Sequence, residues 1–325
     1  MGCYGEVMNG PALNHNPAVP TASTMRDALS SGAVTSASAA PVLRHLLSPG
    51  DPATFCDAAL AQVRGILSDL ARHLLAARAE AADMRNALTF IENGERALAG
   101  LLANDDALLS HIHALALETI LTERLQATVA LDPVVSPLLQ DFIASDDGEA
   151  AGLAMEVLAA QARFGQQQQR MELPPGELPD DLFLKAVLAM RAHAGAGDID
   201  AQSAESLLRE QRRGHPARLV LIEDFIDGTS LDIGERLSVG RAGLAIFLSA
   251  LALASGQERS QLVLSLFTRD SLYPALAMRA SGLEPDRVER QLALLGVAPC
   301  TDGDLADIAP AEAAMLLANR NASGT

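Results

Sequence analysis

The sequence is poor in the residues that build β-sheets. It has no tryptophan and two tyrosines, and aromatic residues occupy only 3% of its 325 positions. β-branched residues are also sparse, whereas alanine and leucine are abundant. Strands favour β-branched and aromatic side chains, while alanine and leucine are strong helix formers. The composition therefore predicts an all-α fold, and the length suggests two domains.

Basic residues are scarce as well. The formal net charge is −17, and Lys185 is the only lysine, so arginine carries the rest of the positive charge. Nucleic-acid binding and binding to anionic membranes both depend on lysine and arginine. We therefore expect neither a nucleic acid nor a membrane as partner and favour a protein partner, and the sequence leaves a homo-oligomer open. The arginine bias is typical of a GC-rich bacterial genome.

Cysteine usage points to a reducing compartment. Cys3, Cys56 and Cys300 are odd in number and far apart, which favours neither a disulfide framework nor a CxxC pair. The first forty residues contain no basic segment followed by an apolar one, so no signal peptide is expected. These features predict a cytoplasmic protein.

One long apolar run, "GLAIFLSALALASG" at 243–256, raises the question of a membrane helix. A membrane-spanning helix needs about 20 apolar residues, and about 10–14 suit a buried core helix. Charged residues flank the run at Arg241 and Glu258. We therefore predict that it is the central helix of its domain, enclosed by neighbours on every side.

The N-terminal half predicts a disordered tail over 1–40, rich in Gly, Pro, Ser and Thr, and a helical bundle over 41–170. The first bundle helix is expected to begin at Asp51 and Pro52. Its apolar seam, with steps of four and three residues, consists of Cys56, Leu60, Val63, Leu67, Leu70, Leu74 and Ala77. Its charged residues off the seam, expected to face away from it, are Arg64, Asp69, Arg72 and Arg78.

Further helices follow from the same periodicity. One is expected over 83–102, where the turn dipeptide Asn93-Gly94 can interrupt it. Another begins at Asp105 or Asp106 and ends before Pro133. Shorter helices fit 135–144 and 149–164. Prolines at 174, 175 and 179 and Gly176 then break the pattern, which predicts a domain boundary with Asp180 or Asp181 capping the next helix.

The second domain, over 171–298, is predicted to be a duplicated three-helix repeat. The segments that align in order are 181–195 with 242–256, 203–210 with "SQLVLSLF", and 215–226 with 273–284. Gly195 and Gly256 fall at the expected helix C-caps. A closing helix in "LEPDRVERQLALLG" places Val288, Leu292 and Leu295 on one face and turns Glu289, Arg290 and Gln291 away. Residues 299–325 are expected to be flexible, with a short helix at 311–317.

The segments "RFGQQQQRMELPPGELPDDLFLKAVLAMRAH", "AGLAIFLSALALASGQERSQLVLSLF" and "LYPALAMRASGLEPDRVERQLALL" resemble an alphaproteobacterial family of the sphingomonad type, domain of unknown function 2336. The resemblance covers roughly residues 105–297 and lies in the order and general composition of these segments. It implies an all-helical cytoplasmic protein and assigns no activity and no functional residues.

The histidines are the first candidates for chemistry. His111 and His113 are two positions apart, so on a helix they point in opposite directions and cannot chelate one ion. A packed or surface role is favoured for both. His73 and His113 each lie on a predicted bundle helix, where phosphotransfer proteins carry a reactive histidine, but neither is followed by the usual neighbours.

Two charged segments are the remaining candidates. Acidic residues gather in "IEDFIDGTSLDIGE" at Glu223, Asp224, Asp227, Asp232 and Glu235. Their spacing does not match a calcium-binding EF-hand loop, so a solvated loop is favoured over a metal site. Arginines gather at Arg209, Arg212 and Arg213, where a helix end attracts cations; the alternative is a docking point for an acidic or phosphorylated partner.

No phosphate-binding loop, dinucleotide-binding fingerprint or nucleophile elbow is present in the sequence. We therefore predict no catalytic, cofactor-binding or metal-binding residues. The favoured function is a non-enzymatic helical protein-interaction module that acts as an adaptor, scaffold or regulator. The alternatives are phosphotransfer on a bundle histidine and an unrecognised helical enzyme.

Overall fold

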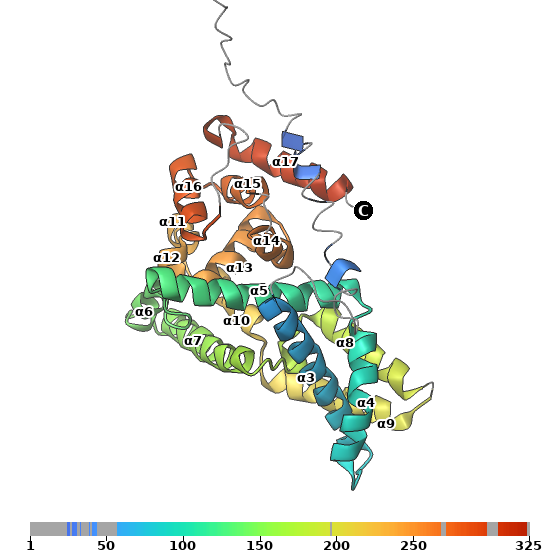
Figure 1. The fold of residues 1–325 in the computed structure, drawn as a ribbon. Coiled ribbons are helices and arrows are strands. Elements are labelled where there is room, and N and C mark those ends of the chain that lie inside the picture. The colour runs from blue at the N-terminus through green and yellow to red at the C-terminus, as the bar shows by residue number, and fades with distance from the viewer. Residues whose placement is uncertain are drawn as a thin grey trace, which may run out of the picture.

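Figure 1 shows the computed structural model of the chain. The structure describes residues 57–195, 197–267, 271–297 and 305–323, together with isolated residues between 25 and 43. Every regular element in these ranges is a helix and none is a strand, which confirms the predicted all-α fold.

The first half of the fold consists of long helices, whose bounds are α3 (Asp57–Ala81), α4 (Ala87–Leu102), α5 (Asp106–Val129), α6 (Pro137–Ile143), α7 (Gly148–Gln169), the short 3-10 helix η1 (Pro175–Glu177), α8 (Asp180–Ala194) and α9 (Ile199–Gly214). Short side chains cap several of them. Asp105 accepts a hydrogen bond from the Leu108 N–H, Ser136 from Leu139, and Asp198 from Ala201.

The second half consists of shorter helices, whose bounds are α10 (Arg218–Gly228), α11 (Ile233–Arg236), α12 (Val239–Ala242), α13 (Leu244–Ser255), α14 (Arg259–Ser265), α15 (Leu272–Ala280), α16 (Pro285–Leu294), the 3-10 helix η2 (Leu305–Asp307) and α17 (Pro310–Ser323). Gly195 and Gly256 end α8 and α13 with positive φ of 98° and 66°, which confirms the predicted C-caps.

Two hydrophobic clusters form the interior, and α5 belongs to both. The N-terminal part of α5, with Ile112 and Leu115, packs with α3, α4, α8 and α9. Its C-terminal part, with Leu121 and Leu125, packs with α6, α7, α10 and α13–α17. In Figure 1 α5 crosses the middle of the molecule, with α13–α17 on one side and α3, α4 and α9 on the other. Glu118 lies between the two parts of this helix.

The predicted seam of α3 is confirmed over the described residues. Leu60, Val63, Leu67, Leu70, Leu74 and Ala77 are all buried, while Cys56 and the predicted start at Asp51 and Pro52 lie outside the described residues.

Two of the charged residues off this seam are buried by contacts with other elements, which the spacing alone did not predict. Asp69 is buried and accepts a hydrogen bond from the Leu173 N–H at 2.9 Å, and Arg78 is buried against Asp198 at 2.9 Å. Arg64 and Arg72 are exposed as predicted.

Three helix boundaries also differ from those predicted. Asn93-Gly94 does not interrupt α4. Gly94 lies against Leu75 of α3, where a side chain would crowd the interface. Helix α7 does not stop at Phe164 but continues to Gln169. Neither Asp180 nor Asp181 caps α8, because Pro179 holds the N-cap position and both acids lie in the first turn.

The apolar run is α13, and eight of its residues, Leu244 to Leu251, are buried as predicted. The last turn differs, because Leu253 is exposed. The run is therefore enclosed on every side only over its first two turns. No helix in the described ranges is long and apolar enough to cross a membrane.

The C-terminal helices also carry corrections. On α16 Val288, Leu292 and Leu295 are buried, but so is Gln291, which was expected to turn away and instead accepts a hydrogen bond from the Val239 N–H. Helix α17 is longer than the predicted helix, and its Ala313, Leu316 and Leu317 are buried in the core.

Other expectations remain predictions. Most of the tail over 1–40 lies outside the described residues, although Met25 and Leu29 are buried in the core. Helices α8 and α9 share a cluster with α3 and α4, so cluster membership does not change at residue 170. The limits of independent domains and the internal repeat stay predictions.

Candidate functional site

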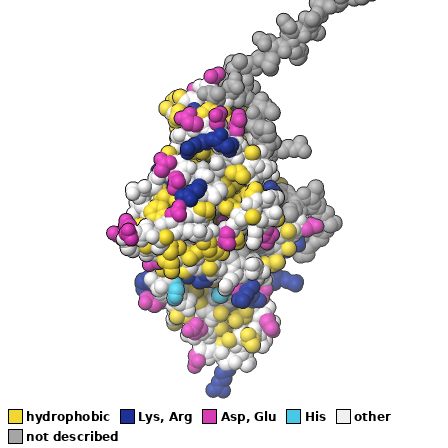
Figure 2. All heavy atoms as spheres, turned by 90° about the vertical axis from the view of Figure 1, so that its left-hand side faces the viewer, with side chains coloured by type: hydrophobic (Ala, Val, Ile, Leu, Met, Phe, Trp, Pro, Cys, Tyr) yellow, Lys and Arg dark blue, Asp and Glu magenta, His cyan; other side chains and the backbone are white. Residues whose placement is uncertain are grey.

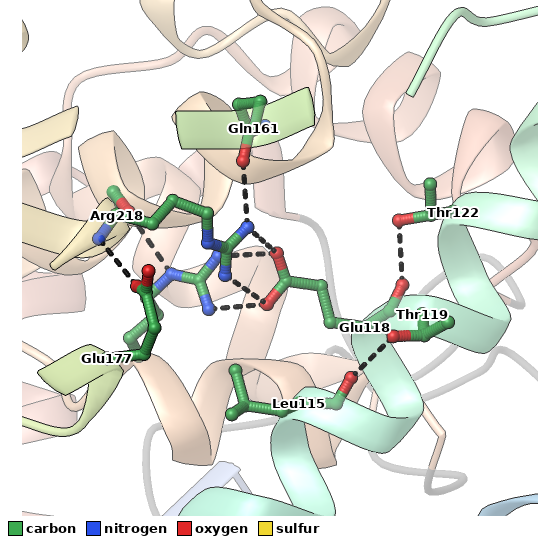
Figure 3. A network of polar contacts seen from close by, with 9 residues as sticks. Leu115, Glu118, Thr119, Thr122, Gln161, Glu177 and Arg218 are labelled. Atoms are coloured by element: carbon green, nitrogen blue, oxygen red, sulfur yellow. Dashed lines mark hydrogen bonds and ion pairs between the residues drawn. The ribbon is translucent and has the colours of Figure 1, made fainter. Parts of the chain in front are cut away.

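A buried ion cluster joins α5, α10 and α14 at the middle of the molecule. The Glu118 carboxylate accepts two hydrogen bonds from Arg218, at 3.1 and 3.4 Å, and two from Arg259, at 2.7 and 2.9 Å. Figure 3 shows Glu118 pointing from α5 toward Arg218. Each guanidinium thus bonds both carboxylate oxygens, which is the geometry of a strong bidentate pair.

Solvent hardly reaches these charges. The side chains of Glu118, Arg218 and Arg259 are 4%, 3% and 13% exposed. Burial alone would raise the pKa of Glu118, but Arg218 and Arg259 outweigh it and hold the pKa well below its usual range. Burial lowers the pKa of Arg218, which Glu118 opposes. The carboxylate is therefore ionised, and the two cations occupy both of its oxygens.

Arg218 has further partners from two more elements. Its Nη1 donates to Gln161 Oε1 of α7 at 3.0 Å, and its backbone N–H donates to the Glu177 carboxylate of η1 at 2.8 Å. Its guanidinium also lies over the Phe164 ring, 3.6 Å from the centroid. Its Nε is buried without a hydrogen-bond partner in the described structure. Arg259 Nε also donates to Ser249 of α13. The cluster therefore connects six elements, which are α5, α7, η1, α10, α13 and α14.

A cavity of about 290 Å³ opens beside the cluster, between α5 and α7. Its floor contains Glu118, Gln161 and Arg218. Apolar side chains form its walls, and they are Leu125, Leu131, Pro133, Val134, Phe164, Leu244 and Ala245. Gly165 of α7 also lines it, and a Cβ at that position would meet no atom within 4 Å. The missing side chain at Gly165 therefore leaves this space open.

The rim of this cavity is rich in amides. Gln126 of α5 and Gln166 and Gln169 of α7 line it and are exposed, and the exposed acidic residues beside them are Glu123 and Asp132. An amide side chain both donates and accepts hydrogen bonds. The cavity, named here the α5–α7 cavity, therefore combines apolar walls, an amide rim and a floor whose charges are paired.

The predicted histidine candidates do not meet in this site. His111 and His113 are both buried on α5, and burial lowers the pKa of each to about 4. His73 of α3 is 44% exposed, and its Nε2 lies 3.3 Å from the Asp69 carboxylate. No group of three metal-ligating side chains occurs among the residues that the structure describes.

The acidic segment is spread over helix surface and loop. Glu223, Asp224 and Asp227 are exposed on α10, Asp232 caps α11 through the Gly234 N–H, and Glu235 lies 3.3 Å from Arg241. These side chains therefore do not converge on one point.

The arginines of the predicted basic patch are paired within the molecule. Arg209 bonds Glu205 at 2.8 Å, Arg212 bonds Asp180 at 2.7 Å, and Arg213 bonds Glu210. The patch is therefore less basic than its sequence indicates.

The sequence analysis did not single out the ion cluster, although two signals were present. Glu118 interrupts an apolar stretch, "HALALETIL", on the buried side of its helix. Arg218 and Arg259 occupy the first positions of α10 and α14, where the helix dipole disfavours a cation. Arginine at such a position indicates a compensating carboxylate elsewhere.

Comparison of the chain with protein-family models, with curated proteins and with solved structures gives no match. The resemblance to domain of unknown function 2336 therefore stays a prediction.

Proposed function

We propose that this protein is a non-enzymatic helical interaction module, an adaptor, scaffold or regulator, whose α5–α7 cavity receives an apolar side chain of a partner protein. The observation that carries the proposal is the combination of an apolar cavity with an amide rim. Partner proteins anchor on such cavities through one large side chain, while the surrounding contacts exclude water.

The chemistry of the rim favours a polypeptide as the ligand. Backbone amides present alternating N–H and C=O groups, and the amides of Gln126, Gln166 and Gln169 can pair with both. Figure 2 shows the side of the molecule that lies at the left in Figure 1, where hydrophobic side chains gather between charged residues of both signs. An exposed surface of this kind is typical of protein interaction sites.

The ion cluster itself supports a structural role. A general base needs a free lone pair directed at its substrate. Both oxygens of Glu118 already accept hydrogen bonds from Arg218 and Arg259. The cluster therefore fixes the floor of the cavity and leaves its walls and rim to make the contacts with a partner.

The phosphotransfer alternative stays a prediction, and the geometry now favours one of its two histidines. His113 is buried on α5, whereas His73 is partly exposed. A phosphoryl donor therefore has access to His73, and acid-labile phosphate on a His73→Gln variant would contradict this choice.

The proposal is tested by filling the cavity. Gly165→Phe places a ring in the open space beside the cavity, and we expect it to abolish the capture of a partner from native lysate. Gly152→Phe is the matched control, because Gly152 also lies on α7 with no atom near its Cβ but does not line the cavity. Both variants replace a helix glycine by phenylalanine, so the change in helix propensity is the same in both.

The measurement is quantitative mass spectrometry of proteins retained by the wild type and by each variant. The proposal holds if a protein is retained by the wild type and by Gly152→Phe but not by Gly165→Phe. Equal retention by both variants, or no protein specific to the wild type, would contradict it.

A further inference from the structure

A second cavity, of about 350 Å³, lies between α3, α7, η1 and α9. It brings together one of the candidate histidines and one arginine of the predicted basic patch. His73 of α3 and Arg212 of α9 both line it, although they are far apart in the sequence. Arg163 of α7 and His215, which follows α9, line it as well. We name this the α3–α9 cavity.

Its cations are incompletely paired. One nitrogen of Arg212 bonds Asp180 at 2.7 Å, and the guanidinium lies 4.8 Å from the centroid of Phe183, but Nη1 is buried with no hydrogen-bond partner among the described residues. Arg163 is exposed and forms no ion pair with any described residue. The exposed guanidinium of Arg163 is therefore available to an acceptor in the cavity.

The remaining ionisable side chains that line the cavity are two histidines and two glutamates. His73 is held by Asp69, and His215 is exposed at the C-terminal end of α9. Two carboxylates also line the cavity: Glu177 accepts the Arg218 backbone N–H, and Glu80 is exposed. The cavity thus offers two guanidiniums and the His215 imidazole as donors.

The cavity also offers acceptors. Gln167 lines it, and its Oε1 is buried with no hydrogen-bond partner in the described structure. The exposed Glu80 carboxylate can accept hydrogen bonds from hydroxyl groups of a ligand. A ligand that satisfies the site therefore carries both an anionic group and hydroxyl donors.

We propose that the α3–α9 cavity binds a small phosphate monoester that bears hydroxyl groups, with Arg163 and Arg212 on its phosphoryl oxygens. Two guanidiniums and the His215 imidazole provide more donors than a carboxylate has oxygens, whereas the three terminal oxygens of a phosphoryl group can use them. The volume suits a small ligand. The inference concerns a different cavity from that of the proposed function and does not depend on it.

The test is isothermal titration calorimetry of the full chain with glycerol 3-phosphate, glycerate and glycerol. We expect glycerol 3-phosphate to bind at least about tenfold more tightly than glycerate, and glycerol not to bind. Arg163→Gln removes an exposed side chain and is expected to weaken binding by at least about tenfold. His215→Gln is expected to weaken it less.

The matched control is Arg170→Gln, which removes the same charge from the end of the same helix but does not line the cavity. Circular dichroism shows whether each variant is folded. Equal weakening by Arg163→Gln and Arg170→Gln would show only a general charge effect and would overturn the proposal. Equal affinity for glycerate would overturn the phosphoryl assignment, and tighter binding of a phosphoserine peptide would replace the small molecule with a protein ligand.

Discussion

The interior of this protein and its α3–α9 cavity use the same residue types in opposite ways. Arginine, histidine and glutamate occur in both places, at Glu118, Arg218 and His111 in the interior and at Arg163, His215 and Glu80 around the cavity. The interior groups are buried, and the Glu118 charge is neutralised by two guanidiniums. The cavity groups face water and keep free hydrogen-bonding capacity.

The difference teaches that burial decides which role a charged side chain has here. A buried ion must be paired, because its transfer from water is costly, and the pairing with Arg218 and Arg259 occupies both oxygens of Glu118. A charged group at a water-accessible cavity stays hydrated, so it does not have this cost and remains available to a ligand. The comparison predicts that the same chemical change has a large effect in the interior and a small one at the surface.

The largest effect is expected when a carboxylate is introduced without a partner. Leu248→Asp places it among the fully buried residues of α13 and is expected to prevent folding, since its cost of at least about 4 kcal/mol approaches the whole stability of a typical domain. Leu188→Asp makes the same change on α8, at a side chain that is 51% exposed, and should be tolerated. Circular dichroism and gel filtration distinguish the two, and a folded, soluble Leu248→Asp protein would show that α13 is misplaced.

The next effect is expected when an interior charge loses its partner. Glu118→Gln leaves Arg218 and Arg259 buried without a counterion, so we expect the free energy of unfolding to fall by about 3–5 kcal/mol. Arg163→Gln also changes one charge, but at an exposed position, and should alter stability by no more than about 0.5 kcal/mol. Urea denaturation measures both values. Similar values for the two variants would remove the contrast between interior and cavity.

A more gradual effect is expected from pH, through the interior histidines. The pKa values of His111 and His113 are lowered from 6.5 to about 4, so both are neutral in the folded protein while the unfolded chain takes up protons. Their contribution to stability is therefore complete above pH 6.5 and is lost as the pH falls toward 4. Each should reduce the free energy of unfolding by about 1.4 kcal/mol per pH unit in that range.

Glu118 should act in a different pH range. Its pKa is lowered from 4.5, so its contribution is complete above pH 4.5 and is lost only at more acidic pH. Urea denaturation between pH 7 and pH 5 therefore reports on the histidines, among which the pKa of His193 is also lowered, and His111→Phe should reduce the slope by up to about 1.4 kcal/mol per pH unit. A free energy of unfolding that is constant over this range would contradict the buried placement of both histidines.

The local features of the fold could be predicted from the sequence. The helical class follows from composition, the seam from Leu60 to Ala77 follows from its spacing, and the C-caps at Gly195 and Gly256 follow from the conformational freedom of glycine. Each depends on residues within a few positions of one another. The α5–α7 and α3–α9 cavities could not be predicted in this way, because each draws its lining from several helices.

The errors about buried charges share one physical cause. Asp69 and Arg78 were predicted to face away from the seam, and Glu118 was not noticed. Their hydrogen-bond partners Leu173, Asp198 and Arg218 lie 104, 120 and 100 residues further along the chain. A polar side chain can be buried only where such a partner offsets the loss of water. The sequence by itself therefore determined where the helices lie and which apolar faces they bury. Only the tertiary structure decided which charges lie inside, because folding brings together the partners that offset the cost of burying them.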